Sequence, residues 1–499
     1  MGSKSTETRF PIRFSSREAN NIHKTNDLHR YWRNHAVDGY LERYWPGEVD
    51  DEAWIRAIRG ILASRFPKFA NAEIKYFAAG TFNRLYSISN SNWAKTYIFR
   101  VSIPVEPFFK TESEVATMEY IRQHTTIPVP RVYAFSSSDA NDLGFEWILL
   151  EMIRGVPIRT VWPKMPQPAR FELFVELAEH IKGLLSLRFS ELGNIYFADI
   201  ADQVNVLPQA PVPLETNGEM SQSNGSKEMH NMNVDIGPDK RFVIGRIVAQ
   251  DFFFDKRIHF PASRGPFRTT RELVDTRMEL LGRRIRNLTT IPGEPYYCES
   301  DLALARHAPV VHAIFEQFKA VVPHLVPHDN GPEDVGVLFH DDISQHNLLV
   351  DPDTFKLAGV VDWESVNIMP AYETNGGIPI FLTDRDFRPT PLFELDRGTP
   401  PNDEWLAAKV RDREAEYGPI RREVLRVVGQ IFDIPNPEAQ RRVKAKQELA
   451  RQLDIENFER RPWATAAWMA ANGLSGARQG AVGPANNDNV DMNGTETTA

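Results

Sequence analysis

Residues 338–364, LFHDDISQHNLLVDPDTFKLAGVVDWE, constrain the fold of this chain more than any other segment. Two short apolar runs, residues 348–350 and 357–361, flank the polar sequence DPDTFK, which is typical of a turn. This pattern predicts a β-hairpin. If the two strands pair about that turn, Asn347 and Asp362 lie opposite each other at its open end, about 5 Å apart.

Such a hairpin end has the chemistry of a magnesium site. An amide oxygen and a carboxylate at that separation can hold Mg²⁺, a hard cation that prefers oxygen ligands and phosphate partners. Asp342 precedes Asn347 by five positions, so we expect it on a loop beside the metal. Its carboxylate could there accept a proton from a hydroxyl that attacks a phosphoryl group.

The spacing of His340, Asp342 and Asn347 is the spacing that kinases use for a catalytic base and a metal-binding Asn. Kinases place a second metal-binding Asp after a short hairpin, and Asp362 occupies that position. An ordinary hairpin with polar ends is the alternative. The full combination of residues disfavours it, because the motif and its context agree.

The rest of the chain indicates a sheet followed by helices. Three β-like runs, EIKYFAAG, NRLYSISN and KTYIFRVSI, precede a helical pattern in ESEVATMEYIRQH and two further β-like runs, RVYAF and GFEWILLEM. This order predicts a small antiparallel sheet with one helix after the third strand. An earlier helix is expected in DDEAWIRAIRGILASRF, with Asp50 or Asp51 as its cap. Helical patterns dominate after Gly155.

These patterns predict an α+β chain with two lobes. Residues 1–68 are expected to form a partly helical extension with a loose polar start, residues 69–154 the smaller lobe and residues 155–472 a larger, mostly helical lobe. Segment 215–240 is rich in Asn, Ser and Gly, which is typical of a flexible insertion. Residues 473–499 have the composition of a disordered tail.

Composition limits the classes of function. With 58 basic and 67 acidic residues the formal net charge is −9, which disfavours nucleic acid as a partner. Cys298 is the single cysteine, so an internal disulfide and a multi-cysteine metal site are excluded. No apolar run approaches the ~20 residues of a transmembrane helix, and we expect a cytoplasmic protein. The start fits the pattern for N-myristoylation at Gly2, with a disordered start as the alternative. Nothing indicates an oligomeric state.

HDDISQHNLLVD and GVVDWE resemble the motif of the aminoglycoside phosphotransferase family, within the protein-kinase-like superfamily, whose members often read H-x-D-x-x-x-x-N and then I-D-W-E. IPVPRVYAF, WILLEMIRG and RGPF further resemble its fungal members. The resemblance covers about residues 70–465. It implies a two-lobed protein-kinase-like fold with ATP or GTP and Mg²⁺ between the lobes. It also implies transfer of the γ-phosphoryl group to a hydroxyl of a small molecule.

In the larger lobe, the resemblance assigns roles to four residues of the motif. Asp342 would be the catalytic base, and His340 would brace its loop. Asn347 and Asp362 would be the magnesium ligands.

In the smaller lobe, the resemblance places AAGTFNRLYSI over the nucleotide phosphates, with Gly80, Thr81 and Asn83 near them. Protein kinases have three glycines there and this chain has one, so a plain hairpin turn at Gly80 is the alternative. Arg100 stands where the family often has Lys, and we expect it to bind the α- and β-phosphates while paired with Glu114. A surface ion pair of little effect is the alternative.

Other assignments concern the adenine and the acceptor. The resemblance implies that Glu151 and Ile153 offer backbone groups to adenine. Glu364 and Asp341 could orient a cationic substrate, support the residues that bind it, or be solvated loop carboxylates. The stretch FVIGRIVAQDFFFDKRIHFPASRGPF, residues 242–267, carries an aromatic cluster and three arginines and could form part of an acceptor site, although aromatic residues such as 252–254 more often belong to a core.

Two other enzyme classes are disfavoured. A Ser/Thr protein kinase would have D-F-G and a later A-P-E, whereas Asp362 is followed by Trp and Glu and residues 365–400 contain no A-P-E. A zinc hydrolase could use His324 and His328, with His340 and His346 downstream, but Pro327 would break a helix between the first two and no H-E-x-x-H is present.

A catalytically silent nucleotide-binding or scaffold protein of the same fold stays open. The departures from the family pattern at Gly80 and Arg100 favour it, and the presence of all of Asp342, Asn347 and Asp362 disfavours it. Replacing Asp342 by Asn distinguishes the two hypotheses, because only a transferase would lose its activity.

Overall fold

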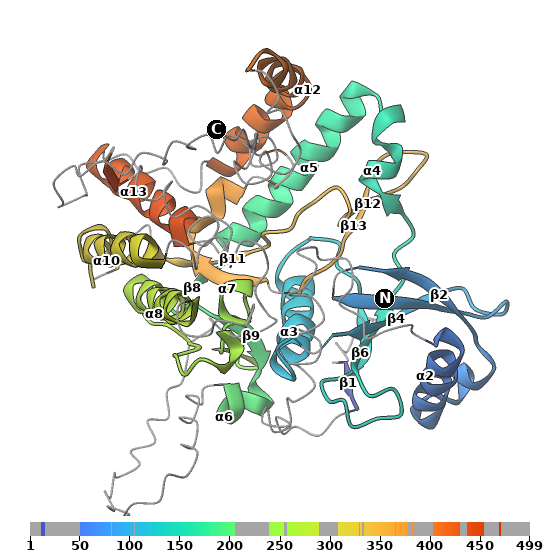
Figure 1. Cartoon of the computed structure of the whole chain (residues 1–499). Coiled ribbons are helices and arrows are strands. Elements are labelled where there is room, and N and C mark those ends of the chain that lie inside the picture. The colour runs from blue at the N-terminus through green and yellow to red at the C-terminus, as the bar shows by residue number, and fades with distance from the viewer. Residues whose placement is uncertain are drawn as a thin grey trace, which may run out of the picture.

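The structure is a computed structural model (Figure 1). It describes residues 11–14, 50–80, 82–103, 105–204, 239–253, 257–288, 308–328, 330–331, 334–364, 366–377, 379, 382, 403–429, 437–453 and 469–470. The predictions for Gly2, Thr81, the insertion up to residue 238 and the tail 473–499 therefore lie outside the described residues.

The smaller, N-terminal lobe (N-lobe) is built on a six-stranded sheet with the strand order β1-β5-β6-β4-β3-β2. Its strands are β1 (Ile12–Arg13), β2 (Glu73–Ala79), β3 (Asn83–Ser89), β4 (Tyr97–Ser102), β5 (Val132–Ser136) and β6 (Glu146–Glu151). The five strands from β2 to β6 are antiparallel, as predicted. The expectation of a loose start is wrong for β1, which pairs with β5 in parallel, because two residues are too few to show a strand pattern.

Two helices belong to this lobe. In α2 (Asp51–Arg65), the predicted cap is present, since the Asp50 side chain accepts a hydrogen bond from the Ala53 N–H at 3.0 Å. Ile58 and Leu62 on this helix are buried with the apolar residues of the sheet. The helix after the third strand, α3 (Phe109–His124), begins three residues before the start predicted for it.

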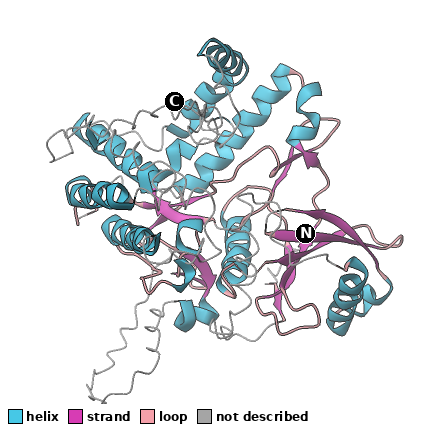
Figure 2. Cartoon of the chain, viewed as in Figure 1, coloured by secondary structure: helices cyan, strands magenta, loops and turns pink. Residues whose placement is uncertain are grey.

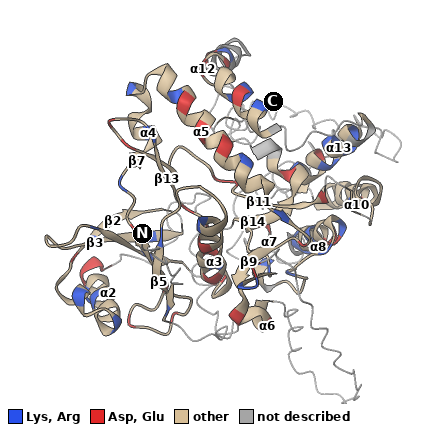
Figure 3. Ribbon diagram, turned by 180° about the vertical axis from the view of Figure 1, so that it is seen from behind, with Lys and Arg blue, Asp and Glu red and all other residues tan. Residues whose placement is uncertain are grey.

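Helix α3 lies between the two lobes (Figure 1). Every residue from Phe109 to Ile121 is buried, including all charged residues of that stretch. Figure 3 shows charged residues along α3 near the middle of the molecule. A continuous apolar core passes through this helix, because Val115 of α3, Ile148 of β6 and Leu348 of the larger lobe belong to one cluster.

The larger, C-terminal lobe (C-lobe) is mostly helical, as predicted (Figure 2). Its α-helices are α4 (Ile158–Val161), α5 (Gln167–Ser186), α6 (Ala201–Val204), α7 (Gln250–Phe253), α8 (Thr270–Leu288), α10 (Ala308–Leu325), α12 (Asp403–Gly429) and α13 (Pro437–Leu453). Its strands are β7 (Val156–Pro157), β8 (Arg188–Phe189), β9 (Asn194–Phe197), β10 (Phe242–Gly245), β11 (Gly336–Phe339), β12 (Leu348–Val350), β13 (Leu357–Val360) and β14 (Asn367–Pro370). The predicted two-lobed α+β fold is confirmed. Among the described helices, none has the length and apolarity that crossing a membrane requires.

The predicted hairpin is formed by β12 and β13, but its register differs from the prediction by one residue. Leu348 pairs with Val360, and the Val361 N–H donates to the Asn347 carbonyl oxygen at 2.9 Å. Asn347 therefore lies opposite Val361, and Asp362 follows one position later. The offset arises at the turn, where Val350 pairs with Leu357 instead of Gly359, two positions away from the predicted register. The irregularity in the ladder between Leu349 and Val350 recovers one of these two positions.

Strand β7 extends this hairpin into a three-stranded sheet of order β13-β12-β7. The segment that leaves the N-lobe after β6 therefore pairs directly with the hairpin. The backbone approach is close at Gly155, where a Cβ would lie 3.0 Å from the Val350 carbonyl oxygen. This sheet fixes the connection between the lobes relative to the polar residues of the hairpin.

Candidate active site

The loop before β12 brings Asp342 and Asn347 into contact, as their spacing predicts. The Asn347 Nδ2 donates to the Asp342 Oδ2 at 2.9 Å and to the Asp342 backbone oxygen at 3.0 Å. Asn347 is buried, whereas Asp342 is exposed at the loop surface. Partial desolvation raises the pKa of Asp342 above its usual value, against the lowering effect of the Asn347 hydrogen bond. The Asp342 carboxylate is thus oriented by Asn347 and exposed to solvent, as the predicted role of a base requires.

Asp362 follows the hairpin with a left-handed backbone, at φ 66°. Its Oδ1 is buried and has no hydrogen-bond partner in the described part of the protein. Burial raises the pKa of Asp362 well above its usual value, and the charge of Glu364 adds to this effect. A buried carboxylate oxygen without a donor is rare in proteins unless an ion or water satisfies it. Asp362, together with the Asn347 amide, therefore fits a hard cation such as Mg²⁺.

His340 is buried at the base of this loop, with its ring centroid 4.8 Å from that of Trp363. The Trp363 Nε1 donates to the Val360 carbonyl oxygen at 2.8 Å, which ties the pair to the hairpin. Burial lowers the pKa of His340 to about 4, and a contact with the Val361 backbone opposes this only in part. His340 is therefore neutral at pH 7, and its role as a brace stays a prediction.

Arg100 of β4 and Glu114 of α3 form an ion pair. Their side chains are 6% and 1% exposed, so the alternative of a surface pair does not hold. Burial lowers the pKa of Arg100, but the Glu114 carboxylate outweighs this effect and the net pKa is raised. The negative charge of Asp362 also favours the charged guanidinium. The structure thus places the predicted phosphate-binding cation next to the predicted metal ligand.

Glu364, whose role the sequence left open, lies at the centre of a polar network. Its Oε2 accepts a hydrogen bond from the Asn83 Nδ2 at 2.8 Å and lies 2.6 Å from the Lys110 Nζ. The Asn83 Oδ1 accepts in turn from the Ser102 hydroxyl at 2.9 Å. The positive charges of Lys110 and Arg100 outweigh burial and lower the pKa of Glu364.

Lys110 and Ser102 are functional candidates that the sequence reasoning missed. Lys110 precedes Glu114 by four positions, so both side chains project from the same face of α3. This spacing is a detectable signal, but the predicted helix began at residue 112 and left Lys110 outside it. Ser102 carries no comparable signal, because a lone serine at a strand end is common.

Three other residues predicted to bind the nucleotide, namely Gly80, Glu151 and Ile153, lie at turns or strand ends of the N-lobe. Gly80 lies in the turn between β2 and β3, where its N–H donates to the Asn83 oxygen at 2.8 Å. A Cβ at Gly80 would meet no atom within 4 Å, so packing does not require glycine there. The Glu151 N–H donates to the Arg131 oxygen at 2.8 Å, so this backbone N–H is already paired. Ile153 follows the end of β6, beside Gly359 of the hairpin.

The structure decides some of the open alternatives. Phe252 and Phe253 are each 1% exposed and belong to the apolar core, while Phe254 lies outside the described residues. Within the described ranges, no three side chains among His, Cys, Asp and Glu gather in a way that could hold a metal ion. This does not bear on a magnesium site with an amide and a carboxylate, because water and phosphates complete the shell of Mg²⁺.

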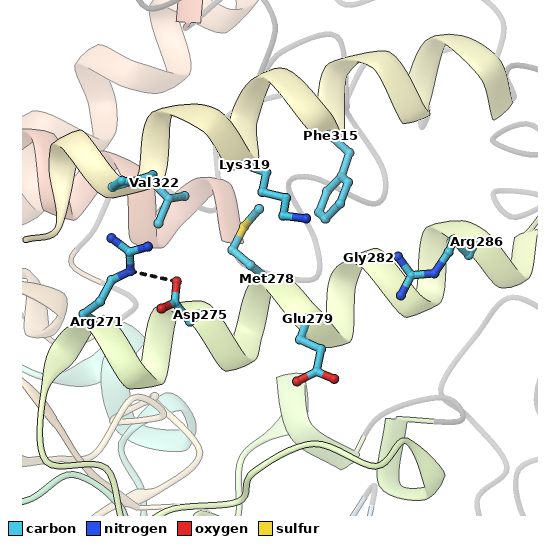
Figure 4. Close-up of a pocket in the computed structure, with 10 residues that line it drawn as sticks. Arg271, Asp275, Met278, Glu279, Gly282, Arg286, Phe315, Lys319 and Val322 are labelled. Atoms are coloured by element: carbon cyan, nitrogen blue, oxygen red, sulfur yellow. Dashed lines mark hydrogen bonds and ion pairs between the residues drawn. The ribbon is translucent and has the colours of Figure 1, made fainter. Parts of the chain in front are cut away.

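A separate cavity of about 380 Å³ lies between α8 and α10 (Figure 4). Met278, Phe315 and Val322 contribute much of its apolar lining, and its Arg271 is paired with Asp275 at 2.8 Å. None of the residues predicted for catalysis or nucleotide binding lines it. The polar network around Asp362, rather than this cavity, is therefore the candidate active site.

The chain is similar in sequence to known proteins over most of its length. Residues 73–373 match the phosphotransferase enzyme family. A subtelomeric hrmA-associated cluster protein of Aspergillus fumigatus is 25% identical over 352 residues, which cover 64% of this chain and 62% of that protein. Altered inheritance of mitochondria protein 9, mitochondrial, of Candida albicans is 23% identical over 382 residues, or 73% of this chain and 57% of that protein. The chain thus spans less than two thirds of these relatives.

Solved structures are similar at lower identity. The aminoglycoside phosphotransferase APH(4)-Ia is 14% identical, with a TM-score of 0.39, over 85% of this chain and 100% of that chain. An ethanolamine kinase of Plasmodium vivax is 12% identical, with a TM-score of 0.37, over 89% of this chain and 98% of that chain.

Proposed function

The chain belongs to the phosphotransferase enzyme family, and from this premise we propose that it transfers the γ-phosphoryl group of ATP to a hydroxyl of a small molecule. One observation carries the proposal. The Asn347 amide, which orients the exposed Asp342, and the partnerless buried oxygen of Asp362 come from the same hairpin. This arrangement supports the proposal, because a catalytic base and a cation site would then belong to the same end of one hairpin, and phosphoryl transfer depends mainly on positioning and charge stabilisation.

The residues would divide the work as follows. Asn347 and Asp362 would hold Mg²⁺, which when bound neutralises charge on the transferred group. Arg100, held by Glu114, would bind phosphate oxygens that the nucleotide presents to β4. Asp342 would accept the proton of the attacking hydroxyl. Catalysis by these groups would consist mainly of positioning and charge stabilisation.

The nucleotide site is tested by thermal unfolding of the full chain with ATP, with and without Mg²⁺. The wild type should be stabilised by ATP only when Mg²⁺ is present, and Asp362→Asn should abolish that effect. Asn is preferred to Ala here, because Asn tolerates the left-handed backbone at φ 66° and Ala does not. Wild-type protein that is folded and shows no stabilisation by ATP or GTP would reject the proposal.

The transfer step is tested by ADP release with a panel of hydroxylated small molecules. Asp342→Asn should lower the rate about 10²–10⁴-fold, the usual contribution of a general base, and should leave nucleotide binding unchanged. The Oδ1 of the new amide can still accept the hydrogen bond from Asn347, so the loop is expected to persist.

The alternative function is a catalytically silent nucleotide-binding or scaffold protein. Arg100 favours this alternative, because related proteins often have Lys at that position, and Arg and Lys differ in how they bind phosphate. This alternative predicts ATP binding without acceptor-dependent ADP release in the wild type. GTP in place of ATP is tested in the same assay.

We keep the cytoplasm as the proposed location. The name of the Candida albicans relative makes the mitochondrion the alternative, and cell fractionation distinguishes the two.

A further inference from the structure

A short segment of the N-terminal extension is anchored at the edge of the N-lobe sheet (Figure 1). Strand Ile12–Arg13 pairs in parallel with β5, and the Phe14 N–H continues this ladder by donating to the Phe135 oxygen at 2.8 Å. The Phe14 ring lies 5.0 Å from the Trp147 ring in an edge-to-face arrangement. The backbone on both sides of Arg13 is therefore held, and so is the direction of its side chain.

The Arg13 guanidinium joins three distant parts of the chain. Its Nε and Nη2 donate to the two carboxylate oxygens of Glu112 on α3, at 2.9 and 2.6 Å. Its Nη1 donates to the Asp199 Oδ2 in the C-lobe at 2.7 Å. The Glu112 side chain is 0% exposed, and the Ser137 hydroxyl also donates to it at 2.6 Å. Paired, two-point contacts of this kind are the strongest and most directional that Arg makes with a carboxylate.

The opposite face of α3 carries the residues of the active site. Lys110 and Glu114 are four positions apart and share a face, while Glu112 lies between them and points about 160° away from it. Lys110 pairs with Glu364 and Glu114 pairs with Arg100. Helix α3 is thus held by Arg13 on one face and presents both active-site charges on the other.

We propose that Arg13 is a positioning residue for the nucleotide site, because it fixes α3 between the lobes so that Glu114 meets Arg100. The inference rests on the proposed function. Arg13 acts only through the helix and touches none of the predicted phosphate or metal ligands. If Arg13 is removed, the Glu112 carboxylate is left buried without a counter-charge, so α3 must shift or loosen to let water reach it.

The test uses the full chain with Arg13→Met and Arg13→Lys, and measures hydrogen exchange of the α3 and α5 amides together with the Kd for ATP and Mg²⁺. In Arg13→Met the α3 amides should exchange at least about tenfold faster with α5 unchanged, and the Kd should rise at least about tenfold. For Arg13→Lys, both the α3 exchange rates and the Kd should lie between those of the wild type and of Arg13→Met, because Lys keeps the charge but cannot make the two-point contact.

The matched control is Lys446→Met, which breaks another buried pair far from α3 in the sequence. Lys446 lies 2.6 Å from Asp334, and their side chains are 1% and 2% exposed. This variant should lose thermal stability while α3 exchange and the Kd stay as in the wild type. A purely structural role for Arg13 would make the two Met variants behave alike, and that result would overturn the proposal.

If Arg13→Met does not fold, the double variant Arg13→Met/Glu112→Gln replaces it. Gln can still accept the Ser137 hydrogen bond and leaves no buried charge, so the protein should fold while α3 loses its link to Arg13. Unchanged α3 exchange in this variant would also overturn the proposal. Wild-type protein that binds no nucleotide would reject the proposed function instead, and the exchange data would still decide whether Arg13 fixes α3.

Discussion

Asn83 in the N-lobe and Glu364 beyond the β12–β13 hairpin are joined by a hydrogen bond of 2.8 Å across 281 positions of sequence. Lys110, in the first turn of α3, lies 2.6 Å from the same carboxylate oxygen. Three segments that are remote in the sequence therefore meet at one side chain. The position of Glu364 depends on how the two lobes fit together, and the charge beside Asp362 depends on Lys110.

Lys110→Met should lower the free energy of unfolding by about 3 kcal/mol, because it removes the ion-pair partner of the buried Glu364 carboxylate and leaves only the more distant charge of Arg100 to oppose its burial. The two side chains are 2% and 13% exposed. Lys95→Met is the matched control: its pair with Glu151 is 59% and 33% exposed, and such a pair contributes less than about 1 kcal/mol. Urea unfolding without nucleotide measures both. Equal losses in the two variants would contradict this view of Glu364.

Asp362→Asn should stabilise the nucleotide-free protein by about 1–2 kcal/mol, because it removes the charge of a buried carboxyl group whose Oδ1 has no hydrogen-bond donor in the described part of the protein and which is repelled by Glu364. In the presence of Mg²⁺ and ATP the order should reverse, since only the wild type gains binding energy, about 2.7 kcal/mol at 100 times the Kd. Thermal unfolding under both conditions measures this. The control is Asp351→Asn, in the exposed turn of the hairpin. Mg²⁺ and ATP should stabilise this variant as much as they stabilise the wild type, so the order of the two proteins should be the same under both conditions. A nucleotide-free Asp362→Asn that melts below the wild type would refute the argument.

The hairpin and its polar ends could be predicted because their signals are local. Apolar runs around DPDTFK specify paired strands, and the five-residue spacing places Asn347 beside Asp342. The register could not be predicted to the residue, since the turn closes with Val350 opposite Leu357 and the irregularity between Leu349 and Val350 then shifts the ladder by one position. The prediction therefore placed Asn347 and Asp362 at the same end of the hairpin but misplaced Asp362 by one position.

The environment of α3 could not be predicted, because charge along a helix ordinarily indicates a solvated face. Glu112 and Glu114 are buried here, and their partners Arg13 and Arg100 come from other segments. A two-residue strand such as Ile12–Arg13 has no periodicity to detect. Only the folded chain shows that the N-terminal extension supplies a counter-charge to the helix.

Glu146 should make stability fall as the pH rises. It is 4% exposed, and burial raises its pKa to about 7, although the Phe108 N–H and Thr111 oppose this. Between its ordinary pKa of 4.5 and about 7, the folded state binds more protons than the unfolded state, so stability declines over that window. Glu146→Gln should remove this decline and be more stable at pH 8, by at most about 3 kcal/mol. Unfolding from pH 5 to 8 measures it, and parallel profiles would contradict it.

Gly359 of β13 should be intolerant of a larger residue, because it sets the contact between the β12–β13 hairpin and the end of the N-lobe. A Cβ there would lie 2.2 Å from the Ile153 Cδ1 and 3.3 Å from the Pro128 oxygen. Gly359→Ala should therefore displace Ile153, cost about 1–3 kcal/mol and weaken ATP binding. Gly80→Ala is the matched control, since open space surrounds that position and stability should hardly change.

The cause of the Gly359 effect can be isolated with a second variant. Ile153→Val removes the Cδ1 atom, so the double variant Gly359→Ala/Ile153→Val should recover part of both the stability and the ATP affinity. A double-mutant cycle of urea unfolding and ATP titration measures the coupling. If the two substitutions are additive, the side chains do not meet, and the hairpin does not set the position of the predicted adenine-binding segment through this contact.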